Sequence, residues 1–214
     1  AAVNIEKHPF PRKLTKSTRE LFDELGRRSS FLYRMIFANL WCFLPLLDMI
    51  CKKKGGELNA MMRTTVAFTM MEGSKASNVL PPRATMGANL RIISGETVEG
   101  TIQRLRSLVP DEGIRLDLVQ GMNPSRVSET TGEVWEKLKS AIGQTWPEAL
   151  ISPYLMIACS DSRQYSPISE HVYRFSAMAL SSEERGYIHA HNERIPVDKI
   201  VTTAKFYLRL LKKL

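Results

Sequence analysis

The pattern of apolar positions predicts helices at the start of the chain. Residues 1–7 are typical of the end of a helix, which a following pair of prolines would stop. A capped amphipathic helix is expected over Thr15–Gly26, and Phe31–Met49 predicts two short helices bent near Pro45. Because the chain opens within a helix and without an initiator methionine, we expect a fragment of a longer protein.

Two stretches in the middle of the chain alternate between apolar and polar positions, as strands do. Thr64–Met71 and Thr85–Ile93 predict a pair of strands joined by a turn. Glu96–Leu108 has helical spacing, and Ile114–Val119 predicts a further strand. The order α–β–β–α–β is that of an α+β ferredoxin-like layer, βαββαβ, whose first strand is missing.

The pattern changes after residue 121, where we expect a domain boundary. A helix is predicted over Gly132–Trp146, and the final helix over Val197–Leu211. Two continuous apolar runs, Ile151–Ala158 and Val172–Ser176, are typical of strands buried on both faces. Helices that alternate with such strands predict an α/β sheet for this C-terminal part.

Composition and charge narrow the function classes. The 214 residues are 43% hydrophobic and 24% charged, which is typical of a soluble globular protein. The net charge of +8 is spread along the chain, and no zinc-finger, helix-turn-helix or RNP-like pattern accompanies it. The three cysteines show no C-x-x-C spacing, and we expect them to be buried free thiols.

The most apolar stretch, Phe31–Cys51, does not predict a membrane span. Its longest charge-free run, Met35–Leu47, is too short to cross about 30 Å of hydrocarbon at ~1.5 Å per residue. No signal peptide is visible at the start, so we expect a cytoplasmic protein, with the reservation that the N-terminus is expected to be missing.

Three segments carry candidate chemistry. Ser160–Arg163 follows a predicted strand, where Arg163 would offer a fixed fork of donors to a carboxylate; a surface Asp/Arg pair is the alternative. His189 and His191 lie before the last helix, and either a metal role or a solvated loop fits them. Asn78 is most simply a turn former between the paired strands.

In this order, the segments resemble the M20 family of zinc metallopeptidases, especially its carboxypeptidase S-like branch, which cleaves peptides or N-acyl amino acids. Ser77–Pro81 and the segment Ala88–Thr97 are similar to that branch's NV(I/L)P and FRLLPGDT lid segments. Ser160–Arg163 resembles its T-D-(S/A)-R, and Ile188–Ile195 resembles its I-H-G-x-N-E-R-I, with Ala190 in place of the glycine.

The resemblance implies two domains and three functional residues. Residues 1–121 would form the lid, or dimerisation, domain with an apolar helical insertion around residues 27–58, and residues 122–214 the C-terminal segment of the catalytic domain. His189 would be the last zinc ligand, Asn78 a lid amide that touches the substrate, and Arg163 the group that binds the substrate carboxylate. The intact enzyme would hold two zinc ions, act on a peptide or N-acyl amino acid, and form a homodimer through the lid.

This chain lacks the family's H-x-D pair, bridging Asp, Glu-Glu pair and lid G-H-S-S histidine, all of which would precede Ala1. It therefore contains no expected catalytic residue, and we expect it to be inactive alone, with His189 free of metal. Two other functions stay open: a non-catalytic dimerisation or binding module of lid type, and a basic nucleic-acid-binding domain.

Overall fold

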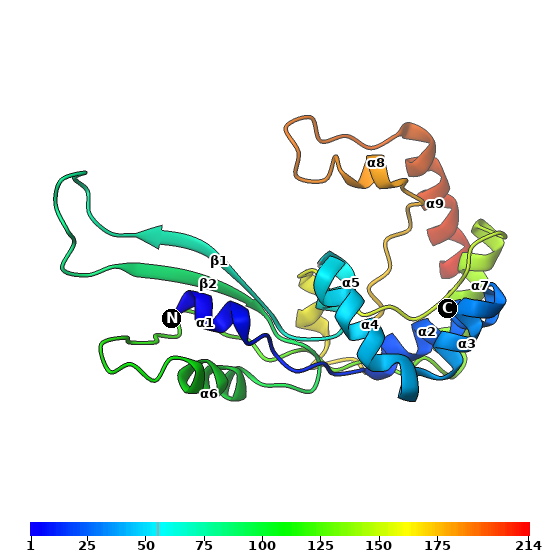
Figure 1. Cartoon of the computed structure of the whole chain (residues 1–214). Coiled ribbons are helices and arrows are strands. Elements are labelled where there is room, and N and C mark those ends of the chain that lie inside the picture. The colour runs from blue at the N-terminus through cyan, green and yellow to red at the C-terminus, as the bar shows by residue number, and fades with distance from the viewer. Residues whose placement is uncertain (55) are drawn as a thin grey trace. The chain divides into compact units, whose positions relative to one another are not determined.

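The chain folds into two compact units. The computed structural model describes residues 1–54 and 56–214 (Figure 1). The first unit comprises Ala1–Arg126 and Tyr154–Cys159, and the second Val127–Pro153 and Ser160–Leu214. The described residues form a mixed α/β structure that is mostly helical and contains one sheet of two strands. The assignment of residues 1–121 to a lid and 122–214 to a catalytic segment stays a prediction.

The first unit contains the expected helices in the expected order. Its elements are α1 (Ala2–Lys7), α2 (Lys16–Arg28), α3 (Phe31–Ala38), α4 (Leu40–Lys54), α5 (Gly56–Ala60), β1 (Thr65–Glu72), β2 (Thr85–Arg91) and α6 (Val98–Leu108). Threonine caps begin two of the helices: Thr15 accepts a hydrogen bond from the Thr18 amide, and Thr97 from the Gly100 amide. These side chains satisfy amides that have no partner inside the helix, so both helix starts follow from the sequence.

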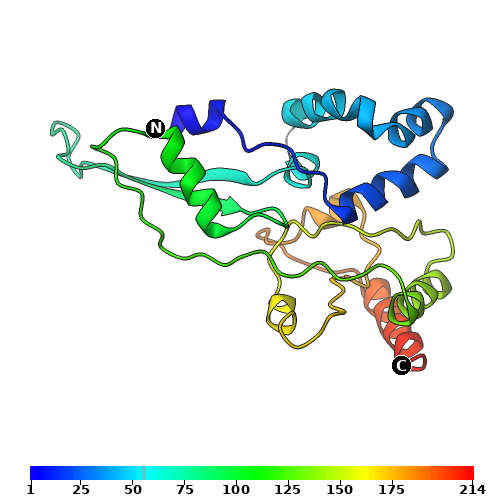
Figure 2. The ribbon, with the colours of Figure 1, turned by 90° about the horizontal axis from the view of Figure 1, so that it is seen from below.

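Strands β1 and β2 form an antiparallel hairpin, as the alternating pattern predicted. Thr65 pairs with Arg91 and Glu72 with Thr85, with an irregularity between Phe68 and Met70. Helix α6 lies across one face of the hairpin, and α1 lies beside α6 (Figure 2). The Asn4 side chain donates a hydrogen bond to the Leu108 carbonyl at 2.6 Å, which joins the two helices.

The third predicted strand of this layer, Ile114–Val119, is not a strand in the structure. A strand is maintained by backbone hydrogen bonds to a neighbouring strand, and among the described residues this segment pairs with neither strand of the hairpin. A two-stranded hairpin on its own is only marginally stable in water, and it leaves one apolar face incompletely covered. The prediction of a ferredoxin-like layer is therefore met only in its central hairpin and in helix α6.

The entry to β1 is the most buried part of the first unit. Met62 and Thr64 are fully buried. The Thr64 hydroxyl donates to Glu96 at 2.5 Å and accepts from the Ile93 amide at 3.1 Å. The Lys13 amide donates to the Met62 carbonyl at 2.7 Å. These hydrogen bonds connect the segment before α2 and the segment after β2 to residues 62–64.

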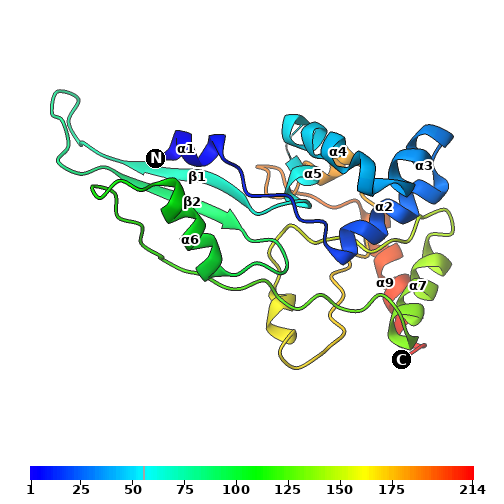
Figure 3. The same ribbon diagram turned by 60° about the horizontal axis from the view of Figure 1, so that its bottom comes forward.

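Helices α3 and α4 are bent by 106° at Asn39 (Figure 3). The prediction of a bend near Pro45 was wrong, because Pro45 lies inside α4. The Asn39 side chain donates to the Met35 carbonyl at 2.9 Å and so competes with the backbone at the end of α3. Among the described helices, none alone is long and apolar enough to span a membrane, although this bent pair passes the same test together.

The second unit is built on two helices that pack against each other. Its elements are α7 (Glu133–Thr145), the 3-10 helix η1 (Asp161–Tyr165), α8 (Ser182–Arg185) and α9 (Val197–Leu211). Phe206 of α9 lies in the core with Leu138 and Ile142 of α7. The ring of Trp146 packs on the Phe206 ring, with 5.6 Å between the two ring centres. The final helix has the bounds that the sequence predicted.

The two apolar strands predicted for this part, Ile151–Ala158 and Val172–Ser176, are absent from the described structure. Such strands need a neighbouring strand at their edges and helices on both faces. The second segment is instead fixed by Ser128, whose hydroxyl accepts from the Val172 amide at 2.8 Å. The α/β sheet predicted from these runs is therefore not formed within this chain.

The cysteines differ from the prediction in their burial. All three are free thiols, but only Cys51 is buried, whereas Cys42 and Cys159 are exposed. Burial raises the pKa of the Cys51 thiol. Arg91 lies beside Cys159, with its Nη1 atom 2.9 Å from the sulfur.

Candidate functional site

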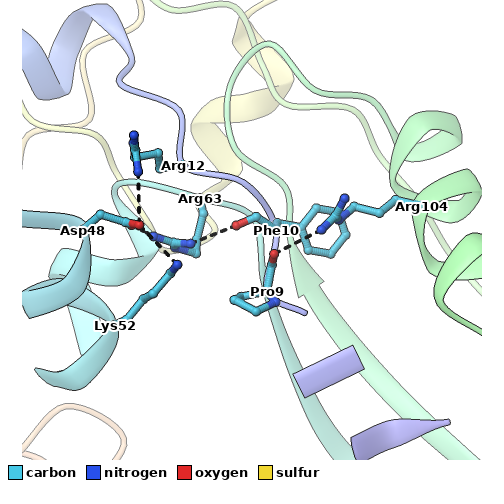
Figure 4. Close-up of polar contacts among 7 residues, drawn as sticks. All are labelled: Pro9, Phe10, Arg12, Asp48, Lys52, Arg63 and Arg104. Carbon is cyan, nitrogen blue, oxygen red and sulfur yellow. Dashed lines mark hydrogen bonds and ion pairs between the residues drawn. The ribbon is translucent and has the colours of Figure 1, made fainter. Parts of the chain in front are cut away.

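A cluster of charged side chains around Asp48 is the most densely organised polar site of the first unit (Figure 4). Asp48 is buried on the inner side of α4. It forms an ion pair with Arg63, which is only 2% exposed. Arg12 lies 3.5 Å and Lys52 3.2 Å from its Oδ2 atom. One carboxylate thus meets three cations, which leaves an excess of two positive charges.

The cluster links segments that are far apart in the chain. Besides its ion pair, Arg63 donates a hydrogen bond to the Phe10 carbonyl at 2.9 Å. Arg104 of α6 donates to the Pro9 carbonyl at 3.1 Å, and its guanidinium lies 5.2 Å from the centre of the Phe10 ring (Figure 4). Burial, and secondarily the charge of Arg12, lower the pKa of Arg63.

A cavity of about 390 Å³ opens beside the cluster. Its lining consists of Pro9, Phe10, Pro11, Arg12, Asp48, Lys52 and Arg63. Arg12 and Lys52 are about half exposed at its mouth, so the excess positive charge favours an anionic over a cationic group there. In the sequence, Asp48 only interrupts the apolar stretch Phe31–Cys51. A single acid in such a stretch is the signal that could have indicated a buried ion pair.

Asn78 lies where the sequence placed it, in the loop that joins β1 to β2. The loop is ordered by Ser74, whose hydroxyl accepts from the Ala76 amide at 3.2 Å and donates to the Ala76 carbonyl at 2.9 Å. Asn78 itself is exposed. It belongs to the first unit, whereas the other two predicted site residues belong to the second.

Arg163 lies in the 3-10 helix η1 and is half-buried. Ser160 caps this helix, because its hydroxyl accepts from the Ser162 amide at 3.3 Å. The strand expected to precede this segment is absent, so Arg163 is positioned by a capped turn and not by the end of a sheet strand. Its own motif, Ser160–Arg163, is nevertheless a defined local structure.

His189 lies in the turn after α8 and is exposed. It has a φ of 62°, the one positive value of a non-glycine residue in the described part of the chain. Left-handed backbone conformations are uncommon for residues other than glycine, although histidine adopts them more readily than most, and strained residues of this kind cluster at functional sites. His191 follows in the same turn region, also exposed and without this backbone conformation.

The segment around His189 is held by local contacts. Ser181 and Glu184 form a capping box at the start of α8, and the hydrogen bond from the Ser181 amide lowers the pKa of Glu184. The Tyr187 hydroxyl donates to Glu183 at 2.6 Å, which raises the pKa of Tyr187. Arg194 lies 4.0 Å from the centre of the Tyr187 ring, closing the turn around His189.

The described residues do not by themselves form a metal centre. No group of three or more His, Cys, Asp or Glu side chains comes together anywhere in residues 1–54 and 56–214. A structural or catalytic zinc site in a protein uses at least three such ligands. His189 could thus supply one ligand of a site whose remaining ligands come from elsewhere.

The chain is similar to longer proteins over nearly all of its length. It is 32% identical, over 99% of its residues, to the "Probable carboxypeptidase S-like 2" of Dictyostelium discoideum. It is 29% identical to the "N-fatty-acyl-amino acid synthase/hydrolase PM20D1.1" of Danio rerio and 27% identical to human PM20D1, each again over 99% of the chain. The chain covers 41%, 42% and 43% of these three proteins, so it spans less than half of their length.

A family model agrees with these relatives. Residues 13–117 match the peptidase dimerisation domain M20_dimer, which includes the hairpin and α6. No solved structure matches the chain. The chain therefore carries an M20 peptidase dimerisation domain at residues 13–117 and is, over nearly its whole length, a homologue of carboxypeptidase S-like and PM20D1 proteins.

Proposed function

We propose that this chain is part of a metal-dependent M20 amidohydrolase that cleaves a peptide or N-acyl amino acid next to a free carboxylate. The observation that carries the proposal is the similarity of 99% of the chain to carboxypeptidase S-like and N-fatty-acyl-amino acid hydrolase proteins. The match to a peptidase dimerisation domain supports it independently. In this proposal the chain contributes a lid with a ferredoxin-like layer and the last segment of an α/β catalytic domain.

Three residues of this chain have proposed roles in the longer protein. His189 contributes one zinc ligand, and the remaining ligands and the general base come from outside the 214 residues. Arg163 binds the substrate carboxylate through its planar fork of donors, and the half-buried position of its side chain supports a fixed geometry. Asn78 presents its amide to the substrate from the hairpin loop.

Replacing Arg163 with lysine in the longer protein tests this function directly. We expect KM to rise about tenfold or more with a smaller change in kcat, because an ammonium loses the bidentate grip on a carboxylate that is present throughout the reaction. Substrates whose carboxylate is amidated should respond little to the change. The measurement is steady-state kinetics on matched free and amidated N-acyl amino acids.

The 214-residue chain is the control for that experiment, since we expect it to hydrolyse neither substrate. An equal loss for free and amidated substrates would refute the role of Arg163. Absence of zinc-dependent hydrolysis in the longer protein, for peptides and N-acyl amino acids alike, would refute the proposed function as a whole.

We also propose that the protein forms a homodimer through its dimerisation domain. Each strand of the hairpin has an outer edge that makes no ladder in the described residues. Unpaired strand edges readily add a strand from a second copy. Sedimentation velocity of the longer protein should show a dimer, and Phe68→Pro in β1 should shift it towards monomer. A monomer at all concentrations would contradict the proposal.

A further inference from the structure

The outer face of α3 is apolar although it is exposed. Phe31 and Met35 are one helical turn apart, with Leu32 beside them, and all three are exposed. Phe31 is 80% exposed. The opposite side of the helix is packed, because the Phe37 ring stacks on Phe22 of α2 at 5.3 Å. The apolar face is therefore the side of α3 that points away from α2.

Helix α4 continues the same pattern after the bend. Trp41, Pro45 and Met49 are spaced by four residues and share one face, with Leu46 and Ile50 next to it. All five are exposed, and Trp41 is 83% exposed. Large apolar side chains that are exposed together along two successive helices are typical of surfaces that bind a protein partner or a membrane. We call these exposed residues of α3 and α4 the apolar arm.

The charges within helices α3 and α4 themselves are mostly positive. Residues 29–54 contain four cations, Arg34, Lys52, Lys53 and Lys54, and a single acid, Asp48. The structure turns that acid inward onto Arg63, so no carboxylate lies on the exposed face of either helix. The exposed cations Arg34, Lys52 and Lys53 flank the arm at both ends. A partner with negative charge beside an apolar region matches this distribution.

The geometry favours binding at a surface over crossing a membrane. Helix α4 has 15 residues and α3 has 8, which correspond to about 22 Å and about 12 Å of helix, and the hydrocarbon core measures about 30 Å. The bend of 106° means that the two helices do not form one straight span. Tryptophan, tyrosine and phenylalanine favour the interface between headgroups and acyl chains, and lysine stems extend apolar faces while their charges stay in water.

From these observations we infer that the apolar arm binds the surface of a bilayer that contains anionic phospholipid. The aromatic and aliphatic side chains insert among the upper acyl chains, and Arg34, Lys52 and Lys53 lie at the level of the phosphates. Such binding would bring a protein that acts on amphiphilic substrates to the surface where they partition, but it does not depend on the proposed hydrolase activity.

Vesicle co-sedimentation tests the inference. The 214-residue chain and the longer protein are each mixed with vesicles of phosphatidylcholine alone or with phosphatidylglycerol added. We expect both proteins to bind the anionic vesicles, with weaker binding to phosphatidylcholine and at high salt. The double variant Phe31→Ser/Trp41→Ser should bind about tenfold or more weakly, because it removes two large apolar groups from the contact.

Three further variants test whether the apolar arm itself inserts into the vesicle and whether its cations contribute to binding. Val119→Ser/Ile168→Ser removes two strongly exposed apolar side chains outside the arm and should leave binding unchanged. Trp41→Phe keeps the apolar face, so it should preserve binding while abolishing most of the vesicle-induced blue shift of tryptophan fluorescence. Arg34→Glu/Lys53→Glu leaves the apolar face intact and should weaken binding to anionic vesicles about tenfold or more, which keeps the test decisive if the serine variant fails to fold.

Three outcomes would overturn the inference. The first is equal vesicle binding by the wild type and by both the serine and the charge-reversed variants. The second is binding by the 214-residue chain but not by the longer protein, which would show that the rest of the protein covers the arm. The third is absence of vesicle binding together with a dimer that the serine variant dissociates, which would make the arm an interface between two copies.

Discussion

Replacing His189 with alanine in the longer protein is expected to lower its amide-hydrolase activity by about 100-fold or more and to weaken one zinc position. Loss of even an outer-shell partner of a metal ligand typically costs about 10- to 100-fold in activity or metal affinity, and a direct ligand should cost at least as much. His191→Ala should cost little, because that histidine occupies the variable position of the motif. Turnover and zinc content of the purified variants measure both effects.

The backbone of His189 requires a matched variant. Its φ of 62° means that alanine changes both the imidazole and the ease with which the chain adopts this conformation. Asparagine tolerates the left-handed region and removes the imidazole, so His189→Asn isolates loss of the ligand. We expect it to be as inactive as the alanine variant. If His189→Asn keeps zinc and activity, or if His191→Ala loses them, the assignment is wrong.

Removal of the Asp48 carboxylate is expected to have the largest effect on stability. In Asp48→Asn, Arg63 stays buried without a charged partner, and the free energy of unfolding should fall by about 3–5 kcal/mol. That is a large fraction of the stability of a typical domain. The helix that carries Asp48 and the segment around Phe10 should loosen together, because both are bonded to Arg63. Urea unfolding followed by fluorescence measures the change.

An exposed ion pair of the same unit provides the control. Asp23 and Arg27 of α2 are 2.8 Å apart but both exposed, so Asp23→Asn should cost only about 0.3–0.5 kcal/mol. A compensated variant, Asp48→Leu/Arg63→Met, removes both charges and should recover much of the loss. If Asp48→Asn destabilises no more than Asp23→Asn, the buried pair does not stabilise the fold as described.

The local elements of the chain could be predicted wherever their causes are local. The caps Thr15 and Thr97, the apolar spacing of Val197–Leu211 and the alternation in the hairpin lie within a few residues of what they determine. The strands that were predicted but not found depend on partner strands that are distant in the sequence. Ile151–Ala158 has the composition of a buried strand, but a run of apolar residues forms a strand only beside another strand.

The predicted site residues divide in the same way. The motifs at Ser160–Arg163 and Ile188–Ile195 placed Arg163 and His189 in defined turns, although the flanking strands expected for them are absent. The positive φ of His189 could not be read from the sequence, because a histidine in that conformation leaves no pattern in its neighbours. Their roles in binding zinc and substrate stay predictions.

The sequence by itself indicated the M20 dimerisation domain, the longer helices and the hairpin, because motifs, caps and periodicity act through residues close in the chain. Only the tertiary structure decided that Asp48 faces inward to Arg63 and that apolar side chains of α3 and α4 remain exposed. These features depend on which surfaces meet in space. A carboxylate in an apolar helix can face water or a buried arginine with the same sequence pattern, and the choice is made by the packing of segments up to about fifty residues apart.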